Sequence, residues 1–224
     1  MKNFIDIFIN PSTVFRSIKE KPDWIRPLIV VLLGLCIISV LSISTTKELI
    51  TAQQIDVMKE QNMTEEQIEQ AMKFISGPFI YVSAIIGTII RVSIILLIFA
   101  LLLNIFIPMA GGKGSYKLVF SVVSYSALIK IPAHLLRWIL IMLKHSLQVS
   151  TSLAIFIPNL PVKSFAFRLL SSFDFFIIWE MILVAMGISI TNNMKKDNAY
   201  ILVFAIWIAS AFLGIRLGGL FGPR

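Results

Sequence analysis

The chain alternates between long apolar runs and short polar segments. The apolar runs cover residues 27–44, 78–107, 118–143, 173–190 and 200–220. Each run approaches or exceeds the ~20 residues that a helix needs to cross the hydrocarbon core of a bilayer. Backbone polar groups in lipid must be hydrogen-bonded within the chain, so each run is expected to be a helix. The pattern therefore predicts an all-α, polytopic membrane helical bundle with five transmembrane helices.

A shorter apolar stretch at 153–160 leaves a second count open. It contains Pro158 and is followed by Pro161. At under ~14 residues, such a stretch is expected to lie at the interface or to re-enter the bilayer rather than span it. A six-span count is therefore the main alternative.

Composition agrees with a membrane domain. Hydrophobic residues make up 57% of the chain and charged residues 14%, and the mean hydropathy is +0.88. Soluble domains contain about a quarter charged residues. The formal charge of +8 comes from Lys and Arg residues at the ends of apolar runs, so no nucleic-acid partner is expected. The single cysteine, Cys36, excludes an intrachain disulfide or a cysteine metal site.

The positive charges predict an orientation. The lead-in at 1–26 is too charged for a cleaved signal peptide, so the first run acts as the insertion signal. Basic residues that fall on one side of a five-span chain are Lys2, Arg16, Lys19, Lys21, Arg26, Lys113, Lys117, Lys195 and Lys196. Lys144, Lys163 and Arg168 fall on the other side and weaken the bias. The N-terminus is expected in the cytoplasm of a bacterial cell, and the loop at 45–77 and the tail at 221–224 outside.

Two amphipathic segments flank the spans. The first has Asn10 as helix cap and Pro11 at the first helical position, and it ends before Pro22. Its apolar face is expected to lie in the cytoplasmic interface of the membrane. That face consists of Val14, Phe15 and Ile18, and the interfacial anchor on the opposite face consists of Arg16, Lys19 and Lys21.

The second amphipathic segment lies in the loop at 45–77. Thr64 and Gln67 have the spacing of a capping box. Glu65, Glu66 and Glu69 form an acidic face on the helix that follows. We expect an extracytoplasmic helical hairpin, which is either a solvated cap or a surface that docks a partner.

Ionisable residues inside the spans are the strongest candidates for a functional site. Each costs at least ~2.5 kcal/mol at mid-bilayer, so each needs a partner or water. Lys130, His134 and Arg137 recur at helical spacing and share one face. An ion-pair cluster that fixes packing is preferred to an ion or proton pathway, and the excess of bases leaves an anion site open. This intramembrane charged cluster comprises Arg91, Lys130, His134, Arg137, Asp174 and Glu180.

Small residues form a second pattern. They recur every four residues, as Ser83 and Gly87 in the second run, and as Ser210, Gly214 and Gly218 in the fifth. Such spacing permits close helix packing. Packing within the chain is the expected use, and a homo-oligomer is the alternative.

Catalytic patterns do not occur. The chain has no His-Glu-x-x-His pair and no nucleophile elbow, and its only histidines are His134 and His145. The glycine-rich run at 111–114 lacks the spacing of a phosphate-binding loop. We expect no enzyme activity, no metal and no cofactor.

Several stretches resemble the Yip domain family of five-span membrane proteins. They are NPSTVF at 10–15, WIRP at 24–27, GGKGSY at 111–116, VVSYSA at 122–127 and WEMILVAMG at 179–187, followed by the turn at 195–200 and Trp207. The resemblance covers nearly the whole chain, from the lead-in at 1–26 through a membrane domain at 27–220. It implies a cytoplasmic N-terminus, five spans and no enzymatic activity. The chain lacks the long cytosolic N-terminal region of eukaryotic members, which favours a prokaryotic type.

Two functional hypotheses follow. The first is an adaptor or accessory protein that supports trafficking, export or envelope maintenance in the cell membrane. Its expected partners are membrane lipids and other integral membrane proteins, such as an ABC-type export system. The second is a transporter or channel subunit that uses the intramembrane charged cluster.

Overall fold

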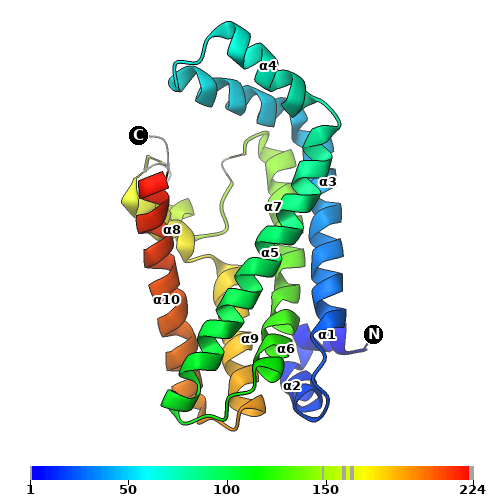
Figure 1. The fold of residues 1–224 in the computed structure, drawn as a ribbon, viewed down its shortest axis with the longest axis vertical. Helices are drawn as coiled ribbons and strands as arrows, with labels where there is room; N and C mark the ends of the chain where they lie inside the picture. The colour runs from blue at the N-terminus through cyan, green and yellow to red at the C-terminus, as the bar shows by residue number, and fades with distance from the viewer. Residues whose placement is uncertain (1, 148, 158–159, 162–163, 222–224) are drawn as a thin grey trace.

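A computed structural model describes residues 2–147, 149–157, 160–161 and 164–221, and within them the chain is helical with no β-strand (Figure 1). The α-helices are α1 Lys2–Ile9, α2 Pro11–Glu20, α3 Ile25–Glu60, α4 Glu65–Ser76, α5 Phe79–Phe106, α6 Tyr116–Ser126, α7 Lys130–Lys144, α8 Phe165–Ser172, α9 Phe175–Thr191 and α10 Lys196–Phe221. Short 3₁₀ turns occupy Pro108–Ala110, Ala127–Ile129 and Leu153–Phe156. The tail at 222–224 lies outside the described residues.

Four helical segments are long and apolar enough to cross a membrane. They are Ile25–Glu60, Phe79–Phe106, Tyr116–Lys144 and Lys196–Ile215. The fifth apolar run forms the shorter helix α9, Phe175–Thr191. Its 17 residues span about 25 Å at 1.5 Å per residue, less than the ~30 Å of hydrocarbon. The predicted all-α membrane bundle is confirmed, and the count of five spans stays a prediction.

The third span is interrupted near its centre. Between α6 and α7 the backbone tightens into the 3₁₀ turn Ala127–Ile129. Pro132 has no N–H to donate to the carbonyl of Leu128, and its ring crowds that carbonyl. A stretch of 3₁₀ geometry within a helix marks local strain of this kind.

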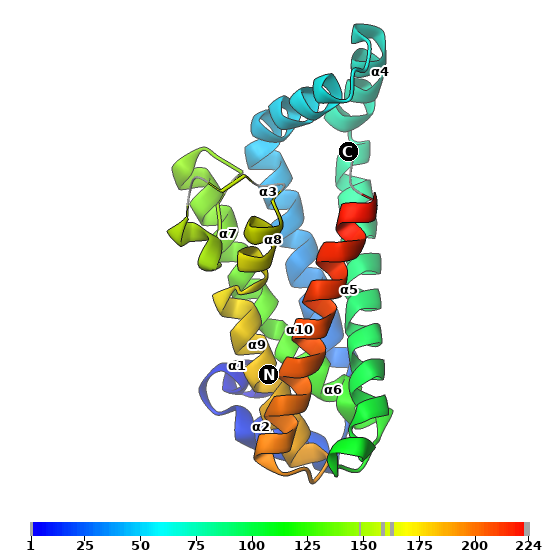
Figure 2. The same cartoon turned by 90° about the vertical axis from the view of Figure 1, so that its left-hand side faces the viewer.

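A kink divides α3 into a membrane part and an outer part. Thr46 has non-helical angles, φ −118° and ψ 18°. The hydroxyls of Thr45 and Thr46 donate to the carbonyls of Leu41 and Ser42, at 2.8 Å and 2.6 Å, and such local bonds bend helices. Beyond the kink, α3 and α4 form a hairpin at one end of the molecule (Figures 1 and 2).

The predicted capping box at the start of α4 is confirmed. Gln67 N–H donates to the Thr64 hydroxyl at 3.3 Å, and Thr64 N–H donates to the Gln67 side chain at 2.9 Å. The two bonds satisfy backbone donors that the first turn of the helix would leave open.

The best-packed region lies where α2, α6 and α9 meet, at the end of the molecule opposite α4 (Figure 1). A Cβ on Gly187 of α9 would lie 2.4 Å from Val122 Cγ1 and 2.9 Å from Phe15 Cε1. Only glycine permits this approach of three helices. The side chains that close around it are apolar and belong to one continuous core.

This packing corrects the predicted position of the first amphipathic helix. The helix runs from Pro11 as expected. Its apolar residues, however, are covered by protein, since Val14, Phe15 and Ile18 are at most 2% exposed. The prediction that this face lies in lipid is wrong, because α9 and α6 offer a complementary apolar surface.

Helix α1 was not predicted. Phe4 stacks on Tyr125 with ring centroids 6.0 Å apart, and Phe8 meets the edge of Trp179 at 6.1 Å. Ile7 is fully buried between them. The i, i+3, i+4 spacing of these three residues was the available signal for an amphipathic helix.

Candidate functional site

An ion pair joins α7 to α9 inside the bundle. Lys130 Nζ lies 2.5 Å from Glu180 Oε2, and the two side chains are 25% and 5% exposed. Lys130 belongs to the first turn of α7, and Glu180 belongs to the second turn of α9. Both charges are compensated, so the pair fixes the two helices relative to each other.

His134 lies one turn beyond Lys130 on the same face of α7. Its Nδ1 is 2.8 Å from the carbonyl oxygen of Lys130. A carbonyl accepts only, so Nδ1 carries the proton and donates it, and Nε2 is left for another partner. Arg137 follows on the same face of α7. Arg91, the remaining basic residue of the predicted cluster, belongs to α5.

Two of these bases have no acidic partner. Within the described residues, no carboxylate oxygen lies within 4.0 Å of the Arg91 or Arg137 guanidinium. The side chains of Arg91, His134 and Arg137 are also exposed at the protein surface. Of the predicted ion-pair cluster, the described residues contain the pair of Lys130 with Glu180.

Asp174 has a different role from the one its sequence position suggests. It caps α9 by accepting the N–H of Phe176 at 2.8 Å, and it accepts the hydroxyl of Thr151. An isolated β-bridge joins its backbone to Ser152. Asp174 forms no ion pair within the described residues, because its oxygens hold the 149–157 segment against the start of α9.

A buried asparagine that the sequence did not single out connects the loops at the other end. Asn192 is fully buried, and its side-chain amide donates to the Lys113 carbonyl at 2.7 Å. In return, the Lys113 N–H donates to the backbone carbonyl of Asn192 at 2.9 Å. Lys19 Nζ donates to Asn193 at 2.5 Å. The lead-in, the loop around Lys113 and the turn at 192–196, all predicted to be cytoplasmic, therefore lie together. Their basic side chains are exposed.

The small residues predicted for helix packing do not contact other helices. A Cβ on Gly87 or on Gly214 would meet nothing within 4 Å, and Ser83 and Ser210 are exposed. The expectation of packing within the chain is wrong for these four residues. The surroundings of Gly218 lie outside the described residues.

Among the described glycines, close approach between two helices occurs instead at two that have no repeating pattern. One is Gly187, described above. The other is Gly34 in α3, where a Cβ would lie 2.9 Å from Ile131 Cδ1 of α7.

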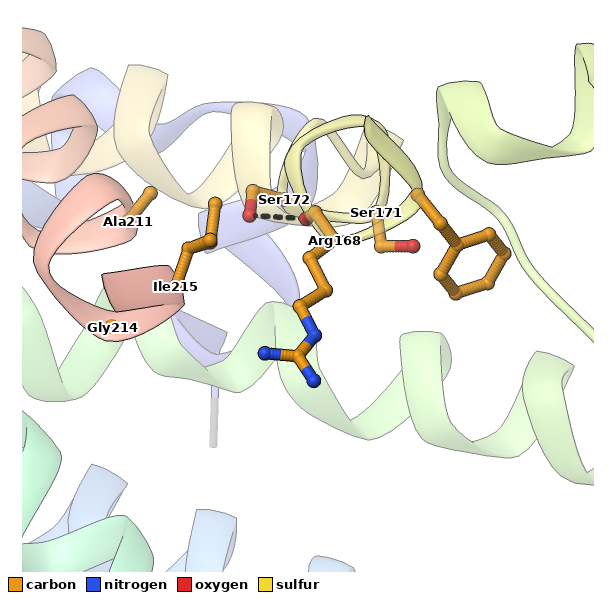
Figure 3. A pocket seen from close by; sticks show the side chains of 7 residues that line it. Arg168, Ser171, Ser172, Ala211, Gly214 and Ile215 are labelled. Carbon is orange, nitrogen blue, oxygen red and sulfur yellow. Dashed lines mark hydrogen bonds between the residues drawn. The ribbon is translucent and has the colours of Figure 1, made fainter. Parts of the chain in front are cut away.

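Figure 3 shows an open pocket between α8 and α10, into which the Arg168 side chain extends. Its volume is about 580 Å³. It is lined by Phe167, Arg168, Ser171, Ser172, Ala211, Gly214 and Ile215. One of the uncovered small residues, Gly214, therefore borders an accessible groove.

The fold defines a polytopic helical membrane protein. Within the described residues, no group of three or more His, Cys, Asp or Glu side chains could hold a metal ion. The model of the Yip1 domain family matches residues 5–217, so the chain belongs to the Yip1 domain family. The membrane protein YknW of Bacillus subtilis (strain 168) is 29% identical over 217 residues, covering 93% of this chain and 88% of the relative. No solved structure matches the chain significantly.

Proposed function

We propose that this Yip1-family protein is a non-enzymatic adaptor of the bacterial cell membrane that binds another integral membrane protein. Its role would be to support export, trafficking or envelope maintenance. An ABC-type export system is the kind of partner that the family resemblance suggests. A second copy of this chain is the alternative occupant of the same surface.

The observation that carries the proposal is the uncovered small-residue surface of α5 and α10. We call this surface the small-residue face; it consists of Ser83, Gly87, Ser210 and Gly214. Membrane helices associate through close packing at small residues, since lipid offers no hydrophobic drive between them. A Cβ on Gly87 or Gly214 would meet nothing within 4 Å, and both serines are exposed, so this spacing is available to a helix from another protein.

Photo-crosslinking in native membranes tests this proposal. Leu213 is 60% exposed and borders the small-residue face of α10, so a photoreactive phenylalanine there samples whatever covers that face. Ile201, 69% exposed, is the matched control. It precedes Ser210 by nine residues, which places it on the opposite side of the helix.

The expected result is a crosslink from position 213, and not from 201, to a different membrane protein identified by mass spectrometry. Crosslinks to this chain alone would identify a homo-oligomer and overturn the adaptor. Equal crosslinking from both positions would mean that the small-residue face has no specific partner.

The excess of basic side chains around His134 favours a second candidate, a transporter or channel subunit. Ionisable residues within membrane spans commonly mark ion and substrate pathways. Flux of ions or solutes into liposomes containing the purified protein tests this candidate. Absence of flux, or flux that R91Q and E180Q leave unchanged, would exclude it.

A further inference from the structure

The groove between α8 and α10 has two walls of different chemistry. Helix α8 supplies its polar groups, from Arg168, Ser171 and Ser172, whereas α10 supplies only the small or aliphatic residues Ala211, Gly214 and Ile215. Figure 3 shows the Arg168 side chain extending into the space between them. The volume of about 580 Å³ lies within the ~300–1,000 Å³ range of small-molecule sites. The groove therefore suits an amphipathic ligand.

The charge of Arg168 has no counter-ion in the described part of the chain. No carboxylate oxygen there lies within 4.0 Å of its guanidinium, and its guanidinium donates no hydrogen bond there. The Ser172 hydroxyl donates to the Arg168 backbone carbonyl at 3.0 Å, which leaves the guanidinium unused. A guanidinium binds two oxygens of one phosphate through parallel hydrogen bonds. The polar wall of the groove thus offers a free fork to a phosphate.

Helix lengths place the groove at the level of the lipid head groups. Ala211 and Ile215 follow Lys196, the first residue of α10, by about 22 Å and 28 Å along the helix axis. Helix α9 is about 25 Å long, and α8 ends just before it starts. The turn at 192–196 joins α9 to α10, so both helices measure depth from the same end. For a hydrocarbon core of ~30 Å that begins at this turn, the groove lies at the far boundary.

Exposed apolar side chains accompany the polar wall at this level. Helix α8 packs against the turn Leu153–Phe156, where Ile155 is 53% exposed and Phe156 is 79% exposed. Phe165, the first residue of α8, is 51% exposed. Aromatic and aliphatic side chains at the boundary of a bilayer insert among lipid molecules. The element that carries Arg168 is therefore expected to contact lipid directly.

We propose that this groove binds one anionic phospholipid. Its phosphate lies on the Arg168 guanidinium, and an acyl chain runs along Ala211, Gly214 and Ile215. Arg168 is one of the cations on the side of the membrane where the positive-inside pattern expects few, and the lipid phosphate supplies its counter-charge. The inference goes beyond the adaptor proposal, because it requires no partner protein and is tested on the purified protein alone.

Thermal unfolding in detergent tests the groove with three probes. They are phosphatidylglycerol in mixed micelles, diacylglycerol with the same acyl chains and no phosphate, and inorganic phosphate compared with chloride at equal ionic strength. The proteins are the wild type, R168Q and the control K144Q. Lys144 is an exposed cation predicted to lie on the same side of the membrane. Native mass spectrometry of the same preparations detects phospholipid retained through purification.

We expect phosphatidylglycerol to raise the Tm of the wild type and of K144Q, and R168Q to need about tenfold more of it, because a charge-assisted hydrogen bond is lost. Retained phospholipid on the wild type and K144Q, with less on R168Q, would also support the groove. Equal responses and equal retention in all three proteins would overturn it, as would an equal effect of diacylglycerol. A response to inorganic phosphate alone would replace the lipid with a free anion. Neither a response nor retained lipid in the wild type would also overturn the proposal.

A leucine on the apolar wall keeps the test decisive if R168Q does not fold. A Cβ on Gly214 would meet nothing within 4 Å, so a side chain there enters the groove instead of the protein core. G214L should weaken the response to phosphatidylglycerol. G87L is the matched control, since a Cβ on Gly87 also meets nothing within 4 Å and lies on α5, outside the groove. Equal responses of G214L and G87L would show that no acyl chain occupies this wall.

Discussion

At the scale of single residues, compensation of charge separates the intramembrane charged cluster into two parts. Lys130 and Glu180 satisfy each other at 2.5 Å, whereas Arg91 and Arg137 form no salt bridge within the described residues. Removing one member of a buried pair leaves its partner uncompensated, which is more costly than never having had the pair. The stability of the protein should therefore depend strongly on Glu180.

Glu180→Ala should lower the free energy of unfolding by about 3–5 kcal/mol, because it leaves Lys130 charged and unpaired. Glu65→Ala is the control, since Glu65 lies exposed in the outer hairpin and surface changes cost within about 0.5 kcal/mol. Thermal unfolding in detergent compares the two. Equal Tm values would contradict the buried ion pair. A double variant, Lys130→Met with Glu180→Leu, should recover much of the loss.

A second residue-scale prediction concerns glycine. Gly187→Ala places a methyl group 2.4 Å from Val122 and 2.9 Å from Phe15, and overpacking of this kind costs about 1–3 kcal/mol. Gly87→Ala is the matched control, because its Cβ would meet nothing within 4 Å. Alanine is the better helix former, so this control should be neutral or slightly stabilising. A greater loss of stability at Gly87 would show that the small-residue face is already covered.

At the scale of elements, the sequence predicted where helices begin better than what covers them. The Asn10 and Pro11 signal predicted α2, and the Thr64 and Gln67 spacing predicted the start of α4. Periodicity shows which face of a helix is apolar. It does not show whether lipid or protein covers that face, because both are apolar. The docking of Phe15 on Gly187 depends on shape complementarity between distant segments, so the local pattern did not contain it.

The charged residues show the same limit. Three-residue and four-residue spacing placed Lys130, His134 and Arg137 on one face of α7. The need of a charge within a span for a partner predicted an ion-pair cluster, but not that Lys130 is the residue that pairs with Glu180. Asp174 was misread because its role is local. It begins a helix, and a carboxylate beside free N–H groups caps them before it pairs with a distant guanidinium.

The docking of α2 gives a prediction at this scale. Phe15→Ala should destabilise the protein by about 3–5 kcal/mol, because a fully buried aromatic ring leaves a cavity between α2, α6 and α9. Ile9→Ala, at a side chain that is 76% exposed, should change stability little. Thermal unfolding and protease protection of the N-terminal segment measure both variants. If α2 instead lay free on the lipid surface, the two variants would behave alike.

At the scale of the whole molecule, polar contacts group the loops at one end. Asn192 bonds to Lys113, Lys19 bonds to Asn193, and Asn198 donates to the Ala110 carbonyl at 3.0 Å. The outer hairpin with α4 lies at the opposite end (Figure 2). The basic segments predicted to be cytoplasmic thus lie at one spatial end of the bundle, and the orientation in the membrane stays a prediction.

The last prediction is the side of the membrane on which the turn at 192–196 lies, and it determines the number of spans. Helix α9 alone is about 25 Å long. The chain nevertheless returns between Lys144 and Asn192 to the end that contains Lys113, since Asn192 bonds there. A crossing completed by α9 would therefore need residues before Phe175 as well. Single cysteines at positions 65, 113 and 195 in a Cys36→Ser background report this through a membrane-impermeant thiol reagent. In intact cells E65C should react, while K113C and K195C should react only after permeabilisation. Reaction of K195C in intact cells, with K113C protected, would mean that α9 does not complete a fifth span.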